Sequence, residues 1–94
     1  MRSRYAAFVL RLEPYLLDTW HPSTRPASIA FVPGQKWLGL KIVAAPAAGE
    51  QRGEVEFIAR YRIGGASADR LHERSRFMRE RERWYYVDGE ISDR

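Results

Sequence analysis

The chain has 94 residues, 45% of them hydrophobic and 13% aromatic, and sixteen basic against twelve acidic side chains give it a formal net charge of +4. This length and composition predict one folded domain, residues 1–94, with a single core. The lack of cysteine excludes disulfides, thiolate zinc sites and cysteine nucleophiles. No apolar run reaches the roughly 20 residues that span a bilayer and no secretory signal is recognisable, so we expect a cytoplasmic protein that does not contact membranes.

Two short helices are expected at the N-terminus. Ser3 is a candidate helix cap, and apolar residues recur at helical spacing as far as about Leu12. A proline is unfavourable inside a helix but favourable at its start, so Pro14 begins a second helix that runs to Thr19. The prolines of residues 21–26 then end helical structure, and irregular chain is expected as far as residue 34.

Four strands are expected to follow, at residues 37–43, 54–63, 70–80 and 83–88. The first should be bent or bulged at Gly39, and Gly89 is interpreted as a turn residue. Helices followed by consecutive antiparallel strands predict an α+β fold, with the N-terminal helices packed on one face of a strongly curved sheet of about four strands. Because two of the strands are unusually long, the sheet should curl into a cone whose mouth is a natural pocket.

The most informative pattern concerns two polar residues on an apolar strand face. Alternate residues of the second strand are apolar (Val55, Phe57, Ala59, Tyr61 and Ile63), and the third strand continues this face with Leu71 and Phe77. Glu73 and Ser75 fall between those two residues, on the same face. A carboxylate and a hydroxyl there must find partners or line a wet cavity. They therefore predict either the polar floor of a pocket or a structural anion held by an arginine or a backbone amide.

Other candidate site residues come from the helices and the loop after them. Tyr5, Trp20 and His21 could reach the cone mouth, where His21 could act as a base, although a hydrogen bond at the helix end would also explain this histidine. His72 should lie on the opposite face from Ser75, which excludes a serine–histidine pair. Arg4 is expected to pair with a carboxylate from the sheet, with Glu73 a candidate partner.

The arginine content raises the question of nucleic acid. Six arginines lie between residues 70 and 83, and arginine suits phosphate binding because its planar fork makes bidentate contacts. Acidic residues interleave with these arginines, however, and neither an RNP-like aromatic signature nor a helix-turn-helix pattern occurs. The pattern favours a solvated, ion-paired sheet face over sequence-specific nucleic-acid binding. Two histidines without cysteine predict no tight metal site, and no phosphate-binding glycine motif is present, so no cofactor is expected.

Several phrases of the sequence resemble the middle domain of the bacterial YchJ-like family. In chain order these phrases are Met1-Arg2-Ser3-Arg4-Tyr5, Thr19-Trp20-His21-Pro22-Ser23-Thr24-Arg25-Pro26, Trp37-Leu38-Gly39-Leu40, Val55-Glu56-Phe57, Leu71-His72-Glu73-Arg74-Ser75-Arg76-Phe77 and Trp84-Tyr85-Tyr86-Val87-Asp88-Gly89. The resemblance covers nearly the whole chain and implies the cone-shaped fold of the nuclear transport factor two-like superfamily. It implies little about activity, because this fold hosts enzymes and binding modules.

One departure from the family concerns zinc. Members usually carry cysteine-rich, zinc-binding SEC-C segments around this domain, and this sequence has none. The resemblance therefore leaves two alternatives: a stand-alone domain, or a chain that lacks an upstream portion. It transfers no zinc site to these residues.

These observations lead to three hypotheses. The first is a non-enzymatic module that binds a small molecule or a protein at the cone mouth, near Tyr5, Trp20, His21, Glu73 and Ser75. The second is a small enzyme of the same fold that uses Glu73 or His21 as a general base. The third is a binder of the nucleic-acid backbone. The polar outer face of the sheet favours a monomer over a dimer.

Overall fold

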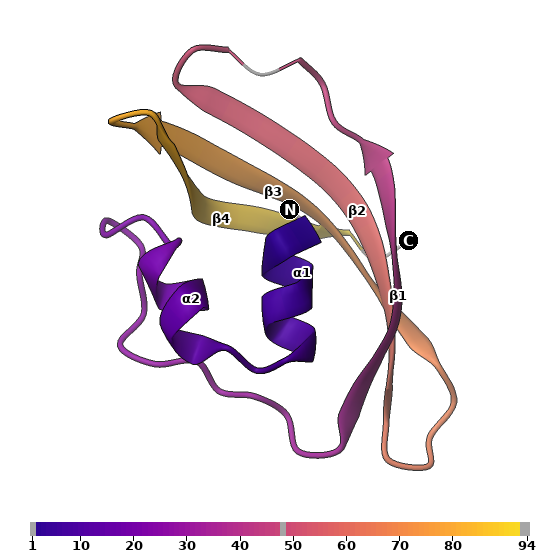
Figure 1. Ribbon diagram of the computed structural model, residues 1–94. Helices are drawn as coiled ribbons and strands as arrows, with labels where there is room; N and C mark the ends of the chain where they lie inside the picture. The colour runs from indigo at the N-terminus through magenta and orange to yellow at the C-terminus, as the bar shows by residue number, and fades with distance from the viewer. Residues whose placement is uncertain (1, 48, 93–94) are drawn as a thin grey trace.

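The computed structural model describes residues 2–47 and 49–92. The expected domain boundaries, residues 1 and 94, lie outside the described residues. Two helices come first and four strands follow (Figure 1): α1 (Arg2–Val9), α2 (Glu13–Asp18), β1 (Gln35–Ala44), β2 (Arg52–Ile63), β3 (Asp69–Glu80) and β4 (Arg83–Ser92). This order confirms the expected α+β class.

The first helix is shorter than expected and lacks the predicted cap. It begins at Arg2, so Ser3 lies inside its first turn, and there the Ser3 hydroxyl accepts a hydrogen bond from the Tyr15 hydroxyl. It ends at Val9 because Arg11 turns into the left-handed region, at φ 55°, and the Leu12 amide donates back to the Ala7 carbonyl. The predicted end near Leu12 overlooked this turn, because nothing in the local sequence demands it.

The second helix begins one residue before Pro14 and ends one residue before Thr19. Pro14 therefore occupies the first turn, where its missing amide hydrogen costs no intrahelical bond. Thr19 follows the helix end, and its hydroxyl donates to the Tyr15 carbonyl.

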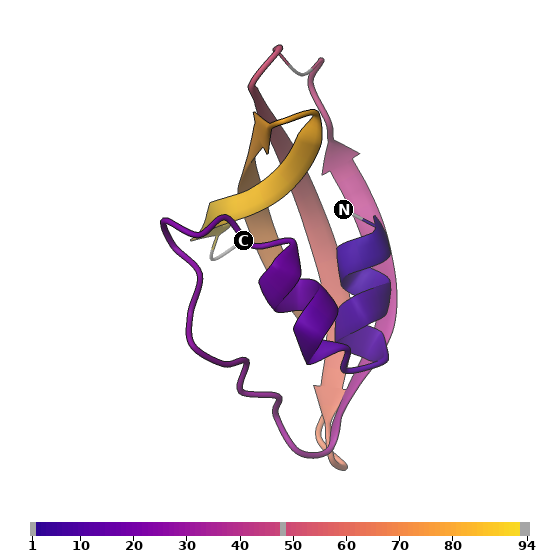
Figure 2. The same ribbon diagram turned by 60° about the vertical axis from the view of Figure 1, so that its left-hand side comes forward.

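The four strands form an antiparallel meander in the order β1-β2-β3-β4. The register of β1 against β2 shifts between Trp37 and Gly39, as expected for a bulge at the glycine. The sheet curves strongly, and both helices lie on its concave side (Figures 1 and 2). A parallel bridge between Trp20 and Tyr86 ties the end of the helical segment to β4.

The last strand extends past the predicted end. Gly89 does not form a turn: it lies inside β4 and pairs with Ser75 of β3. Glycine and glutamate are both depleted in strands, so Gly89 and Glu90 gave no local signal that the strand continues.

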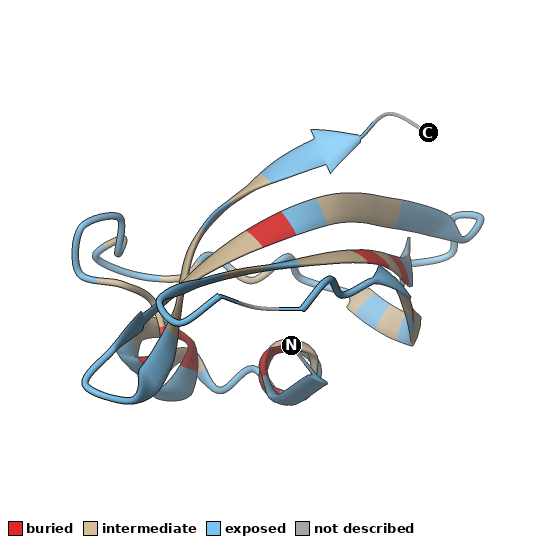
Figure 3. Ribbon diagram, turned by 90° about the horizontal axis from the view of Figure 1, so that it is seen from above, coloured by how far each residue is buried: buried red, intermediate tan, exposed pale blue. Residues whose placement is uncertain are grey.

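The core is small and lies between the helices and the middle of the sheet (Figure 3). Ala7, Leu16, Phe57 and Ala59 are its buried apolar residues among those described. The burial of Phe57 and Ala59 confirms the predicted inner face of β2, although Ile63 at the strand end is exposed. Within residues 2–47 and 49–92, no helix is both long enough and apolar enough to cross a bilayer.

Candidate functional site

A cavity of about 260 Å³ lies between α1 and the concave face of the sheet; we call it the central cavity. Most of its wall is aromatic and comes from α1, the segment after α2, and three strands. The aromatic residues are Tyr5, Phe8, Trp20, Trp37, Phe57 and Tyr86. Three polar side chains, Arg4, Glu73 and Ser75, share this wall. An apolar cleft with a few convergent polar groups is the usual form of a small-molecule site.

Glu73 and Ser75 both face this cavity, as the sequence pattern predicted. Ser75 is completely buried and donates a hydrogen bond of 2.5 Å to Glu73 Oε2. The Tyr86 hydroxyl donates to the same oxygen at 3.3 Å. Desolvation by burial and the neighbouring Glu73 carboxylate raise the pKa of Tyr86, which keeps its hydroxyl protonated as a donor.

The second carboxylate oxygen of Glu73 remains available. No hydrogen bond of the described residues uses Oε1. Among residues 2–47 and 49–92, no side-chain nitrogen or oxygen is both buried and without a hydrogen-bond partner. Oε1 is therefore not fully buried, and because Glu73 lines the central cavity, this oxygen can accept a hydrogen bond from a molecule bound there.

Gly89 makes room for the Glu73 side chain. A Cβ atom placed on Gly89 would come within 2.5 Å of Glu73 Oε2 and 2.7 Å of its carboxyl carbon. The Glu73 side chain therefore lies directly over the backbone of β4. The sequence did not indicate that Gly89 makes this space, because the contact depends on the register between β3 and β4.

Arg4 is a buried cation at the edge of the central cavity. Its guanidinium donates to the Thr19 hydroxyl at 2.5 Å and to the Leu16 carbonyl at 3.3 Å. It also lies over the rings of Tyr86 and Trp20, at 4.7 and 5.5 Å from their centroids. Desolvation by burial lowers the pKa of Arg4, and the nearby Tyr86, Tyr15 and Glu73 oppose that shift.

The expected ion pair between Arg4 and Glu73 does not form. No salt bridge joins these two side chains in the described structure, although the Glu73 charge acts on Arg4 at longer range. Arg4 instead turns toward α2, where Thr19 and a free helix-end carbonyl supply acceptors. This arrangement leaves the carboxylate of Glu73 to the cavity.

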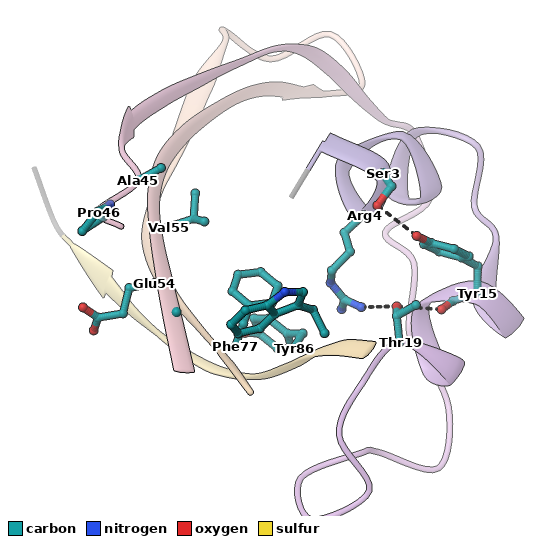
Figure 4. Close-up of a pocket in the computed structure, with 12 residues that line it drawn as sticks. Ser3, Arg4, Tyr15, Thr19, Ala45, Pro46, Glu54, Val55, Phe77 and Tyr86 are labelled. Atoms are coloured by element: carbon teal, nitrogen blue, oxygen red, sulfur yellow. Dashed lines mark hydrogen bonds between the residues drawn. The ribbon is translucent and has the colours of Figure 1, made fainter. Parts of the chain in front are cut away.

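A second cavity of about 300 Å³, which we call the side cavity, adjoins the central one (Figure 4). Arg4 and Tyr86 belong to the walls of both. Figure 4 shows Val55 projecting from the sheet toward the open space, with the chain of hydrogen bonds from Arg4 through Thr19 to Tyr15 on the helical side. The wall of the side cavity includes Trp84, which is partly exposed.

His21 is separated from the other four predicted site residues. Tyr5, Trp20, Glu73 and Ser75 line the central cavity, whereas His21 belongs to the wall of neither cavity. Its Nε2 lies 2.7 Å from Glu80 Oε1 and its Nδ1 2.7 Å from Ser23 Oγ. The expectation that His21 reaches the cone mouth overlooked the turn after Trp20, which directs the ring toward the end of β3.

The convex face carries the expected cross-strand ion pairs, but with other partners. His72 lies on this face, whereas Ser75 of the same strand points to the concave face. His72 forms a hydrogen bond of 2.6 Å with Glu56. This hydrogen bond lowers the pKa of Glu56, and Arg74 adds to the effect. Arg76 bonds both Asp88 and Glu90 on this face, whereas Arg83 pairs with Asp18 of α2. The pairs on the sheet face join β3 to both of its neighbours, β2 and β4, a distribution that the sequence did not indicate.

No group of three or more histidine, cysteine, aspartate or glutamate side chains able to hold a metal ion occurs within the described ranges.

Comparisons with known proteins all place the chain in the same protein family. Residues 1–89 match the family model described as the YchJ middle NTF2-like domain. A UPF0225 protein of Polaromonas naphthalenivorans is 60% identical over 90 residues, and one of Xanthomonas campestris pv. campestris is 56% identical over 91. These matches cover 96% and 95% of this chain. The chain spans 65% of the length of the Polaromonas relative and 70% of the Xanthomonas relative.

A solved structure supports the same relationship. The solution structure of a SEC-C motif containing protein from Rhodopseudomonas palustris is 39% identical, with a TM-score of 0.88. The match covers 99% of this chain and 76% of that protein. The resemblance seen in the sequence is thereby confirmed, and the chain belongs to the family of YchJ middle NTF2-like domains.

Proposed function

We propose that this domain is a non-enzymatic binding module whose central cavity takes a small, ring-containing molecule with one hydrogen-bond donor. The observation that carries this proposal is the Glu73 carboxylate, which has one accessible oxygen in a cavity whose wall is otherwise mostly aromatic. The aromatic rings would contact the body of the ligand, and Glu73 Oε1 would orient it by accepting its donor.

The charge arrangement supports a neutral ligand. Arg4 and Glu73 are the two charged side chains in the cavity wall, and their formal charges cancel. Arg4 already has acceptors in Thr19 and Leu16 and two aromatic rings beside it. A neutral donor such as a ring N–H satisfies Oε1 without adding an unpaired charge to a poorly solvated space.

Indole and indene provide a matched pair of test ligands. Their ring systems have nearly the same shape, but only indole carries an N–H donor. The protein has three tryptophans, two of which, Trp20 and Trp37, line the central cavity while Trp84 lies in the side cavity. In ¹H–¹⁵N spectra, indole should shift the indole N–H signals of Trp20 and Trp37 and leave that of Trp84 nearly unchanged.

The Glu73→Gln variant decides the role of the carboxylate. It should lose much of the preference for indole over indene, because a neutral amide oxygen is a poorer acceptor than a carboxylate. Equal binding of both compounds by the parent chain, or no shift with either at millimolar concentration, would contradict the proposal.

The alternative function is that of a small enzyme with Glu73 as the general base. The accessible Oε1 favours it, since a base must reach a substrate proton. His21 is the weaker candidate base, because both of its ring nitrogens already have partners outside the cavity. For a ligand found by screening, an enzyme predicts conversion that Glu73→Gln abolishes while binding persists, whereas a binding module predicts stabilisation without turnover.

We infer further that the curved sheet and its helices form a single cone-shaped, nuclear transport factor two-like domain that acts as a monomer in the cytoplasm. The family description and the many charged side chains on the convex face support this inference. Light scattering after gel filtration tests the oligomeric state: a mass near 11.0 kDa is expected, and twice that value would contradict it.

A further inference from the structure

Part of the convex face carries a cluster of cations without carboxylate partners. We define the basic patch as Lys36, Lys41, Arg60, Arg62 and Arg70. All five side chains are exposed, and none forms a salt bridge with any residue in the described ranges. The ion-paired arginines described above lie elsewhere, on β3 and β4. The patch therefore lies at the end of the sheet near the turn between β2 and β3, away from the ion pairs of Arg74, Arg76 and Arg83.

The sheet register places these cations side by side. Arg60 of β2 stands directly opposite Arg70 of β3, and Arg62 stands opposite Lys36 of β1. Ala59 on β2 is buried and Tyr61 contacts Trp37 on the concave side, so their neighbours Arg60 and Arg62 point outward. Lys41 pairs with Ile58 and joins the same outer face.

These pairings oppose folding. Side chains directly across an antiparallel ladder have Cβ atoms about 5 Å apart, and like charges at that distance destabilise the sheet. Two like-charged pairs on adjacent ladders therefore call for an explanation other than stability.

The patch also accounts for the net charge of the molecule. The chain has sixteen basic and twelve acidic residues. The patch takes five of the basic residues, and its one acidic neighbour is Asp69, which leaves eleven of each sign in the rest of the chain. Asp69 in turn accepts a hydrogen bond from the backbone amide of Arg70.

A hollow in the surface coincides with this charge. Lys41, Arg60, Arg70 and Asp69 line it, together with backbone at the bulge of Gly39. No aromatic residue lines this hollow, so it offers no stacking platform for unpaired bases. A polyanion of high charge density and no exposed bases fits these features best.

We infer that the basic patch binds the phosphate backbone of a nucleic-acid duplex without reading its sequence. Duplex DNA carries one negative charge per roughly 1.7 Å of axis, and each phosphate neutralised by a lysine or arginine contributes about −0.9 to the slope of log K against log salt. With three to five contacts, the slope should lie between about −3 and −4.5. The affinity should not depend on base sequence, and a single-stranded 20-mer of thymidine should bind more weakly than a 20-base-pair DNA duplex.

The test compares two double variants of equal net charge by fluorescence anisotropy with that duplex. Arg60→Gln with Arg70→Gln removes two cations from the patch. Arg79→Gln with Arg81→Gln removes two exposed arginines, one at the opposite end of β3 and one in the turn that follows it, about 30 Å from Arg70 along the strand. The patch variant should bind roughly tenfold or more weakly, with a slope less steep by about 2, while the control should bind almost as well as the parent.

Three results would overturn the inference. Equal losses in the two variants would show that net charge alone attracts the duplex. Equal competition by polyglutamate of matched charge would show that the patch has no preference for phosphate. No measurable binding by the parent at 50 mM salt would show that the patch binds no duplex. Thermal unfolding checks the fold, because the patch variant should be at least as stable as the parent once the like-charged pair is gone.

Discussion

The Glu73 side chain can lie over β4 because Gly89, the residue beneath it, has no side chain. The buried Ser75 hydroxyl and the Tyr86 hydroxyl then hold one oxygen of its carboxylate. The other oxygen is available for a ligand. Three residues on two strands thus orient one functional group, and each can be tested separately.

Gly89→Ala should displace Glu73 without removing it. The new methyl group would meet the carboxylate at a distance that real contacts do not allow. We expect the variant to fold, with modestly lower stability, and to lose the indole-dependent shifts of Trp20 and Trp37. The matched control is Gly39→Ala, since a Cβ there has no atom within 4 Å. If Gly89→Ala bound indole like the parent, Glu73 would not be the ligand acceptor.

Glu73→Gln also separates a structural role from a functional one. If Glu73 mainly satisfies Ser75 and Tyr86, the substitution should lower the free energy of unfolding by roughly 1–3 kcal/mol, the cost of poorly satisfied buried partners. Near-parental stability with lost indole binding would support the functional role. Urea denaturation measures the first quantity, and the spectra described above measure the second.

Phe57→Ala tests the small core. Phe57 is 4% exposed and belongs to the wall of the central cavity, so truncation should enlarge that cavity and cost roughly 3–5 kcal/mol of stability. Leu38→Ala is the control, because Leu38 is 37% exposed and its truncation should change stability by less than about 1 kcal/mol. Chemical denaturation of both variants measures the difference, and similar losses would contradict the assigned core.

At the scale of elements, a hydrogen bond between ionisable side chains joins β2 and β3 on the convex face. The hydrogen bond from His72 lowers the pKa of Glu56 below its ordinary value of 4.5. The unfolded chain therefore binds a proton at Glu56 at a higher pH than the folded chain does. This carboxylate contributes stability that is present above about pH 5 and is lost as the pH falls through the lowered pKa.

Glu56→Gln should accordingly flatten the loss of stability as the pH falls below about 5, as measured by urea denaturation at a series of pH values. Glu54→Gln removes a carboxylate from the same strand face, one that forms no salt bridge with the described residues. That control should keep the parental pH dependence. Identical profiles for Glu56→Gln and the parent would show that the histidine contact adds no pH-dependent stability.

At the scale of the whole molecule, two short helices cover a large curved sheet incompletely. Four apolar residues of the described chain are buried, and two cavities open on the concave side. A ligand in the central cavity should therefore stabilise the fold noticeably. At a free indole concentration ten times its dissociation constant, the gain is about 1.4 kcal/mol. For a domain of this size, that corresponds to an increase of roughly 6–10 °C in Tm. Scanning calorimetry measures the shift, and an unchanged Tm would contradict binding to the folded state.

Local patterns were sufficient to predict the class of the fold and the inward face of the sheet. The alternation along β2 identified Phe57 and Ala59 as core residues, and continuing it along β3 placed Glu73 and Ser75 inside, because successive strand residues point to opposite faces. The sequence also identified the family, since its conspicuous phrases recur in a specific order.

Other features depended on contacts between distant segments, which local patterns do not encode. The room that Gly89 leaves for Glu73, the turn of Arg4 toward Thr19, and the position of His21 beside Glu80 each join residues from different elements. The basic patch arose in the same way, because only the register of β1, β2 and β3 brings its five cations together. Periodicity in the sequence thus determined which side chains face inward, whereas tertiary packing decided which of them meet.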